Sequence, residues 1–155
     1  GIVDAADGGK ELKGGGDAGD ANAGAGNLFG NGAGATAEQA GKAAAAVNAV
    51  SGEQILKAIV DAAGDEQQQG QAAGAATNPI SAAIGTAEAG ANFGAMNGND
   101  KIAAAIVLRG MAKNGKFAVQ NGNGAQDSVK SAVEKAIEEI SKKLKAIADA
   151  AKAAA

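Results

Sequence analysis

The residue types that most enzymes use for acid–base, nucleophilic or metal chemistry are scarce in this chain of 155 residues. Histidine, cysteine, tryptophan and tyrosine are absent. The serines are the remaining candidate nucleophiles, but all fall at or within predicted helices and none lies in a G-x-S-x-G turn. They are Ser51, Ser81, Ser128, Ser131 and Ser141. Because no histidine can act as their base, we expect no enzymatic activity.

Two further patterns suggest ligand chemistry but lack the required context. The glycine spacing G-x-G-x-x-x-G at 24–30 is similar to a dinucleotide-binding loop, yet no strand precedes it and no clear helix follows. We interpret this run as a flexible linker. Asp17, Asp20 and Asn22 could supply calcium ligands, but they lack the alternate spacing and terminal glutamate of an EF-hand loop. A solvated acidic turn is the better interpretation, and we expect no metal or cofactor.

The charge balance also narrows the function. A formal net charge of −3 and a pI near 4.9 argue against nucleic-acid binding, which requires a basic stripe. The densest basic cluster, Lys142, Lys143 and Lys145, lies among acidic residues and is interpreted as a solvated face. No segment approaches the ~18–20 consecutive apolar residues that cross a bilayer. We therefore expect neither a nucleic-acid partner nor a membrane span.

The apolar residues that must form a core are mostly alanine. The hydrophobic fraction is 46%, but only 3 phenylalanines supply aromatic surface. Because alanine buries little area, the core must be thin and built from closely spaced helices. The 25 glycines raise the entropy cost of ordering the chain. We expect modest stability, with mobile connectors at 14–35 and 64–77.

Local signals place the starts and ends of three helices before residue 100. T-A-E-Q at 36–39 has the spacing of a capping box, and S-G-E-Q at 51–54 repeats it. Asn78-Pro79 is typical of an N-cap followed by proline at the first helical position. Gly64 and Gly85 are predicted to end the second and third helices. The expected buried faces of these two helices are Ile55, Leu56, Ile59, Val60 and Ala63, and Ile80, Ala83 and Ile84.

The stretch KIAAAIVLRGMAKNGKFAV, residues 101–119, is where large aliphatic residues crowd together. We predict a helix over 101–113, with Asn99 or Asp100 as N-cap and an end at Asn114-Gly115. Beyond it, residues 116–119 could run extended. The residues expected to be buried are Ile102, Ile106, Val107, Leu108 and Met111.

The charges of this helix suggest where it lies in the protein. At 100° per residue, Lys101, Arg109 and Lys113 share one stripe about 120° wide, and the remaining circumference is apolar or glycine. A helix so little exposed to water is normally central to a bundle. Gly110 would let a neighbouring helix approach its backbone closely.

Residues 128–155 form the last predicted helix. Its apolar residues alternate in steps of four and three, which is the pattern of a coiled-coil seam. They are Val133, Ile137, Ile140, Leu144, Ile147 and Ala151. A helix of this length must lie against another helix or another chain, so we expect a monomer or a weak homodimer.

The predicted fold class is therefore all-α: an irregular helical bundle with glycine-rich loops and a long C-terminal amphipathic helix. We expect a helical domain over 1–120, with the amphipathic helix of 121–155 packing on the same domain. β-Strand alternation is not convincing anywhere in the sequence.

Three phrases of the sequence resemble a known family. They are AVSGEQILKAIVDAA at 49–63, ATNPISAAIG at 76–85 and, most specifically, KIAAAIVLRGMAKNGKFAV at 101–119. In this order and at similar separations they resemble the Borrelia variable surface lipoproteins, the group of VlsE and the variable large proteins. GNLFGNGAGA at 26–35 matches a looser family phrase, so the resemblance covers roughly residues 1–120.

The resemblance implies an α-helical lipoprotein on the extracellular face of the spirochaete outer membrane. Its implied role is antigenic variation and immune evasion, with host antibodies as partners and no enzymatic activity. The implied membrane contact is a lipid anchor on an N-terminal cysteine, and these 155 residues contain no cysteine. We expect antibodies to contact Lys101, Arg109, Lys113, Lys116 and Phe117.

Two other function classes stay open from the residues alone. A helical coiled-coil interaction module would act through the seam of the last helix. A host-binding adhesin would need a persistent exposed patch.

Overall fold

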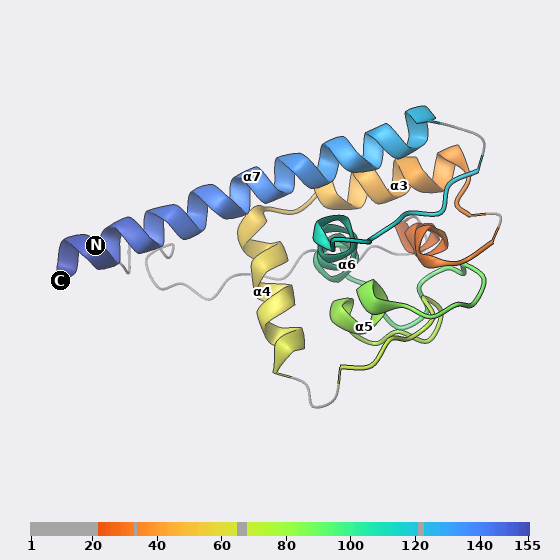
Figure 1. Ribbon diagram of the computed structural model, residues 1–155, viewed down its shortest axis with the longest axis horizontal. Helices are drawn as coiled ribbons and strands as arrows, with labels where there is room; N and C mark the ends of the chain where they lie inside the picture. The colour runs from red at the N-terminus through yellow and green to blue at the C-terminus, as the bar shows by residue number, and fades with distance from the viewer. Residues whose placement is uncertain (1–21, 33, 65–67, 121–122) are drawn as a thin grey trace.

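The structure is a computed structural model that describes residues 22–32, 34–64, 68–120 and 123–155 (Figure 1). Its elements are the 3₁₀-helix η2 (Gly24–Phe29) and the α-helices α3 (Ala37–Asn48), α4 (Gly52–Ala63), α5 (Pro79–Ile84), α6 (Asn99–Met111) and α7 (Asn123–Ala154). Between residues of these ranges, one isolated parallel bridge pairs Ala35 with Val119. The predicted all-α class with a long C-terminal helix is confirmed.

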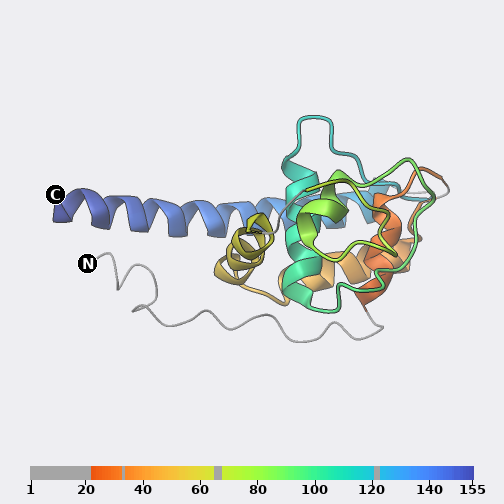
Figure 2. The same ribbon diagram turned by 90° about the horizontal axis from the view of Figure 1, so that it is seen from below.

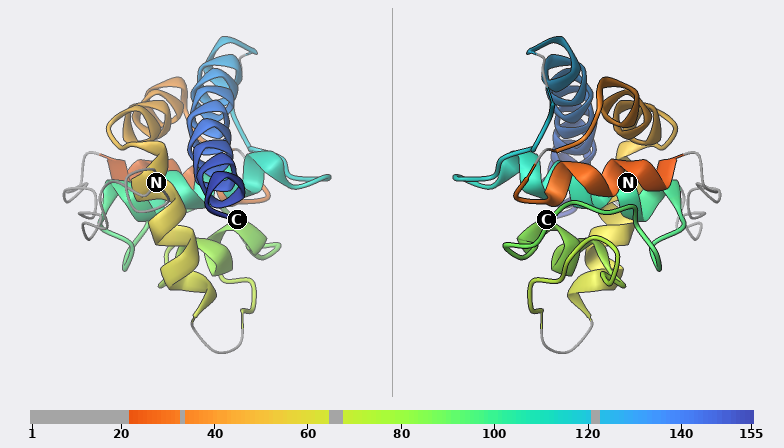
Figure 3. Two further views of the ribbon diagram at one scale, coloured as in Figure 1. Left: turned by 90° about the vertical axis from the view of Figure 1, so that its left-hand side faces the viewer. Right: turned by 90° about the vertical axis from the view of Figure 1, so that its right-hand side faces the viewer.

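Helix α6 lies at the centre of the molecule. It contacts α3, α4, α5 and α7, and the end-on views show α3 and α7 side by side with α5 on the far side of α6 (Figure 3). Ile102, Ile106 and Val107 are fully buried, as expected. The interpretation of α6 as a central, covered helix is confirmed.

The ends of α6 differ from the prediction. Gly98 is the N-cap and makes no side-chain cap bond, whereas the carboxylate of Asp100 accepts from the backbone N–H of Lys101 at 2.9 Å. The helix ends at Met111, whose side chain is 51% exposed, so its predicted burial is wrong. In the last turn α7 packs on Gly110, and the side chain of Met111 stays in solvent. Leu108 is only partly buried.

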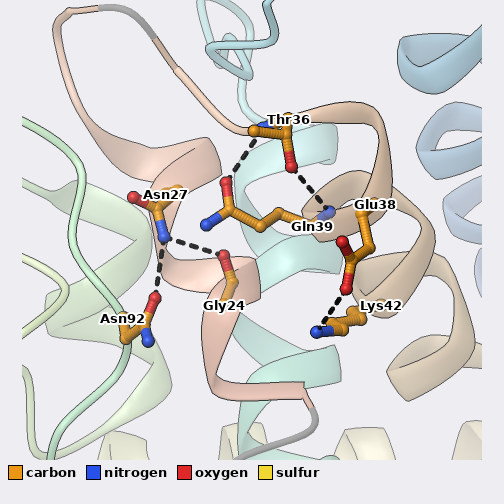
Figure 4. Close-up of polar contacts among 7 residues, drawn as sticks. All are labelled: Gly24, Asn27, Thr36, Glu38, Gln39, Lys42 and Asn92. Carbon is orange, nitrogen blue, oxygen red and sulfur yellow. Dashed lines mark hydrogen bonds and ion pairs between the residues drawn. The ribbon is translucent and has the colours of Figure 1, made fainter.

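The predicted capping boxes are confirmed. In α3, Thr36 Oγ1 accepts from the N–H of Gln39 at 3.3 Å, and Gln39 Oε1 accepts from the N–H of Thr36 at 2.9 Å (Figure 4). Ser51 and Gln54 form the same reciprocal pair at the start of α4. These bonds satisfy backbone donors that a helix leaves free in its first turn, which explains why the two helices begin where the sequence placed them.

Helix α5 begins and ends as predicted but buries a different face. Asn78 Oδ1 accepts from the N–H of Ser81 at 2.9 Å, and Gly85 ends the helix with φ of 68°. The buried residues are Pro79, Ser81 and Ala82, whereas Ile84 is 54% exposed. A helix of 6 residues is too short for periodicity to fix its orientation, so its two connections decide which side faces α6.

The buried face of α4 is also displaced from the predicted one. Ile55, Ala58 and Ala62 face the core, while Val60 is 62% exposed. Small residues determine this orientation, because alanine lets α4 approach α6 closely. At Gly52 an ideal Cβ would lie 3.0 Å from the backbone N of Ile140, so α4 and α7 meet at nearly bare backbone.

The glycine-rich run at 24–30 is a packed element, so its interpretation as a flexible linker is wrong. Leu28 is fully buried and Phe29 is 3% exposed. An ideal Cβ at Gly26 would lie 2.2 Å from Ala91 O, and one at Gly30 would lie 1.9 Å from Gly90 N. The glycines are therefore required where the backbones of η2 and residues 89–93 touch.

Side-chain and backbone bonds reinforce this contact. Asn27 Nδ2 donates to Gly24 O at 3.1 Å within η2 and to Asn92 Oδ1 at 2.9 Å across the contact (Figure 4). The N–H of Phe93 donates to Ala23 O at 2.9 Å. Residues 14–21, which belong to the same predicted connector, lie outside the described residues, and the mobility expected for 14–35 and 64–77 stays a prediction.

Helix α7 packs against the body with only part of its length. Val129, Ala132, Val133 and Ala136 are buried, and the side chains of Val133 reach Gly110 of α6, where an ideal Cβ would lie 2.8 Å from Val133 Cγ1. The close approach predicted at Gly110 is confirmed. Beyond α4 the C-terminal part of α7 extends past the body (Figures 1 and 2), and Leu144 is 48% exposed.

We predict opposite outcomes for two glycine-to-alanine substitutions. Gly26→Ala should destabilise the protein by about 1–3 kcal/mol, because the new Cβ meets backbone atoms that cannot move independently. Gly41→Ala lies within α3, where a Cβ meets nothing within 4 Å, and should stabilise by about 0.5–1 kcal/mol through helix propensity. Urea unfolding measures both. Equal effects would contradict backbone contact at η2.

Truncation of a central aliphatic residue should be costly. Ile106→Ala removes a fully buried side chain of α6 and should lower the free energy of unfolding by about 2–5 kcal/mol. Val60→Ala on the exposed side of α4 is the matched control and should change it by no more than about 0.5 kcal/mol. Thermal or chemical unfolding gives both values, and similar losses would mean that α6 is not the centre of the core.

Candidate functional site

The five residues predicted for antibody contact do not form one surface. Lys101 is exposed in the first turn of α6, whereas Lys113 and Lys116 are exposed beyond the other end of this helix. Ala105, halfway between, is fully buried. Lys101 and Arg109 are eight positions apart along the helix, which is roughly 12 Å at 1.5 Å per residue. The predicted continuous stripe of cations is therefore wrong, because its middle faces the core.

The exposed residues that follow the C-terminal end of α6 belong to the segment 112–117, called here the α6 turn. Figures 2 and 3 show this segment projecting from the body. The N–H of Gly115 donates to Ala112 O at 2.9 Å, and an ideal Cβ at Gly115 would lie 1.8 Å from Arg109 O. Only glycine allows the chain to fold back this tightly on the end of the helix. The turn leaves Lys113 and Lys116 in solvent.

Arg109 lies beneath this turn and is largely occupied by contacts within the protein. Its Nε donates to Lys116 O at 2.9 Å, and its Nη1 donates to Ala83 O at 3.1 Å. The guanidinium carbon lies 5.5 Å from the centre of the Phe29 ring, within the range of a cation–π contact. Partial burial lowers the pKa of Arg109 from its ordinary value, but an arginine remains charged.

Phe117 is half-buried and completes an aromatic cluster. Its ring meets that of Phe29 edge-on, with centroids 6.1 Å apart and planes at 87°, and Phe29 lies 5.4 Å from Phe93. All the phenylalanines of the chain are in this cluster. Phe29 belongs to η2, Phe93 to the segment between α5 and α6, and Phe117 to the α6 turn, so the cluster joins three separate segments.

Extended backbone fixes the residues after the α6 turn. The N–H of Ala118 donates to Leu28 O at 2.9 Å, and Ala118 O accepts from Ala35 at 2.8 Å. The N–H of Gln120 then donates to Ala35 O at 2.8 Å. The prediction that 116–119 could run extended is consistent with this bridge. The α6 turn is therefore anchored on both sides, by α6 before it and by these bonds after it.

A groove of about 440 Å³ lies between the α6 turn and α7. Phe117, Val133 and Ile137 supply its apolar lining, whereas Asp127, Lys130 and Glu134 carry charges of both signs. The groove makes the surface next to the α6 turn concave.

A polar contact between α4 and α7 was not predicted from the sequence. Glu139 Oε2 of α7 accepts from the N–H of Gly52 at 3.3 Å, and Lys143 forms an ion pair with Glu53. The carboxylate thus caps the first turn of α4 and matches its positive end. No local signal could have revealed it, because the partners are 87 residues apart.

Several of the other candidates for chemistry have structural roles, and two lie outside the described ranges. Ser51 caps α4, Ser128 Oγ donates to Gly124 O at 3.0 Å, and Asn22 Nδ2 donates to Asn99 Oδ1 at 2.8 Å. Asp17 and Asp20 are not described. Where the structure describes the chain, no group of three or more acidic, histidine or cysteine residues could hold a metal ion. Over the same ranges no helix has the length and hydropathy to cross a bilayer.

These features define an all-helical protein in which the other helices surround α6 and the connecting segments lie at the surface. A family model described as Borrelia lipoprotein matches residues 1–154, and the chain belongs to this family. No curated protein sequence matches the chain.

A solved structure is similar in both sequence and fold. The chain is 42% identical to the Lyme disease variable surface antigen VlsE of Borrelia burgdorferi, with a TM-score of 0.73. The match covers 89% of this chain and 52% of VlsE, so the chain corresponds to about half the length of that protein. The chain is therefore a Borrelia lipoprotein with a VlsE-like fold, and the family resemblance stated from the sequence is confirmed.

Proposed function

We propose that this chain is part of the ectodomain of an antigenic-variation lipoprotein that helps the bacterium to evade host antibodies. The single observation that carries this proposal is the similarity in sequence and fold to a variable surface antigen. The arrangement of α6 supports it, because a covered helix can maintain the fold while the residues around it change. In this role the protein has no enzymatic activity and needs no cofactor.

The proposed location is the extracellular face of the outer membrane. Family membership supports it, and attachment would use an N-terminal lipid rather than a helix of the described ranges. Residues 1–120 and 121–155 are proposed to form one folding unit, since Val129, Ala132 and Val133 share a single apolar core with α3 and α6. The body would then present its connectors to host antibodies.

Antibodies are proposed to contact the α6 turn rather than the whole of 101–117. Lys113 and Lys116 are exposed and belong to no ion pair within the described ranges. Phe117 offers only part of its ring. Lys101 would belong to a separate antibody contact at the start of α6. Arg109 would act mainly by supporting the α6 turn from beneath.

A competition assay tests this view of the surface. An antibody raised against the free peptide 97–120 should be inhibited by native chain roughly tenfold or more weakly than by unfolded chain, because much of the peptide is covered in the native fold. Ile55→Asp provides the unfolded chain, since it places a carboxylate at a fully buried position outside the peptide. Val60→Asp, on the exposed side of the same helix, is the folded control.

The assay has a clear negative outcome. If native chain and the Ile55→Asp variant inhibit equally, α6 is accessible and the proposed separation of covered framework from exposed connectors fails. Circular dichroism of each variant establishes which chains are folded at the assay temperature.

A coiled-coil interaction module is the second candidate, and the protruding part of α7 favours it. Ile140 is partly buried against the core, but Leu144 is 48% exposed and the helix continues for ten residues to Ala154. Leu144, Ile147 and Ala151 continue the heptad seam along this part of the helix. A second copy of this chain, aligned along the same seam, would cover them.

Sedimentation measures this alternative directly. If the seam joins two copies, the chain should show a concentration-dependent dimer that Leu144→Lys abolishes, since a charge then lies in the apolar contact. Lys145→Ala, one residue away on the polar side, should leave the dimer intact. A monomer at all concentrations would remove the coiled-coil alternative.

A further inference from the structure

Arg109 joins three segments that are far apart in the sequence. Its two hydrogen bonds reach Ala83 O at the end of α5 and Lys116 O in the α6 turn, and its guanidinium lies over the Phe29 ring of η2. The contacts span 26 residues in one direction and 7 in the other. One side chain thus connects α5, η2 and the α6 turn.

The chemistry of this position requires a guanidinium group. Its planar fork directs N–H donors towards two carbonyls at fixed angles, while its face stacks on an aromatic ring. Ala83 O is one of the carbonyls that a helix leaves without a partner at its C-terminus, where a positive charge is also favourable. A lysine ammonium is a compact charge and cannot make both directed bonds while keeping a flat face on Phe29.

The surrounding backbone is shaped to accommodate Arg109. An ideal Cβ at Gly85 would lie 2.8 Å from Arg109 Nη1, and the φ of 68° at Gly85 also favours glycine. At Gly115 a Cβ would collide with Arg109 O. Two glycines on different segments therefore leave the space that this side chain and its backbone occupy.

Arg109 contacts two backbone carbonyl groups and one aromatic ring. Arg109 takes part in none of the ion pairs found within the described ranges. Carbonyl oxygens satisfy its donors and the aromatic ring covers one face, so the contact depends on the direction of the bonds. By contrast, the exposed pairs such as Lys42 with Glu38 hold flexible side chains in solvent and contribute little.

We propose that Arg109 is a positioning residue that fixes the native conformation of the α6 turn. Antibodies that recognise Lys113 and Lys116 in this conformation then depend on a side chain that lies mostly beneath their contact surface. The inference rests on the proposed function where it concerns antibodies, but the effect on the turn is independent of it. A change at Phe29 or near Ala83 would alter recognition of the turn from a distance.

Site-resolved hydrogen exchange tests the positioning role. Arg109→Met keeps an apolar stem but removes the donors and the charge, so exchange within 112–117 should become about tenfold faster or more, while exchange at 102–107 stays unchanged. Arg109→Lys should not restore slow exchange. Phe29→Leu, which keeps apolar volume but removes the ring face, should loosen the same turn.

Lys113→Met is the matched control, because it removes a cation from the turn itself and leaves the Arg109 contacts in place. It should leave exchange at Lys116 and Phe117 unchanged. If Arg109→Met leaves the exchange of the turn unchanged, or raises it equally at 102–107, the positioning role is overturned. The second result would assign Arg109 to general stability instead.

Antibody binding separates the inference from the proposed function. A monoclonal antibody selected on native chain for the α6 turn should bind Arg109→Met about tenfold or more weakly, and Lys101→Met with unchanged affinity. Equal binding to wild type and Arg109→Met would overturn the link to recognition. Failure to obtain any antibody against the native turn would count against the proposed function, while the exchange result would still decide the role of Arg109.

Discussion

The close approach of backbones around α6 is the constraint on which the rest of this structure depends. Ala103, Ala104 and Ala105 are fully buried, and Gly110 admits a side chain of α7 directly onto the helix. Small residues bury little area each, so the helices must come close together to exclude water. Any larger side chain at these contacts would separate elements that have few other apolar residues to hold them.

The same constraint extends to the connectors. The backbones of η2 and residues 89–93 touch because Gly26 and Gly30 have no side chain between them. Leu28 and Phe29 on the same element then reach the core. A glycine-rich connector can therefore be well packed when its glycines face another backbone. Substitutions in such a segment have a cost that depends on whether the position faces solvent or the neighbouring chain.

A packed framework with exposed ends suits the proposed role, in which host antibodies recognise the surface. The helices share one apolar core, while the α6 turn projects from it on a support made by Arg109 and the aromatic cluster. Exposed charges such as Lys113 contribute little to stability. Residues of this kind can change without loss of the fold, whereas the contacts beneath them cannot. Membership of the Borrelia lipoprotein family is consistent with this division.

The sequence alone determined the class of the fold, the family and most helix boundaries. Capping boxes at 36–39 and 51–54, Asn78-Pro79 and Gly85 act over three or four residues, so they can be recognised without knowledge of distant contacts. The burial of Ile102, Ile106 and Val107 was also predictable, since no other stretch concentrates so much aliphatic surface.

Only the tertiary structure decided which face of each short helix is buried and which cations are available. Val60, Ile84 and Met111 are exposed although their sequence patterns predicted burial, because a sequence pattern does not reveal how near two helices come. In the candidate site, the exposure of Lys113 and Lys116 followed from the sequence, but the internal role of Arg109 did not. Its partners lie on α5, on η2 and in the α6 turn, and only folding brings them into contact.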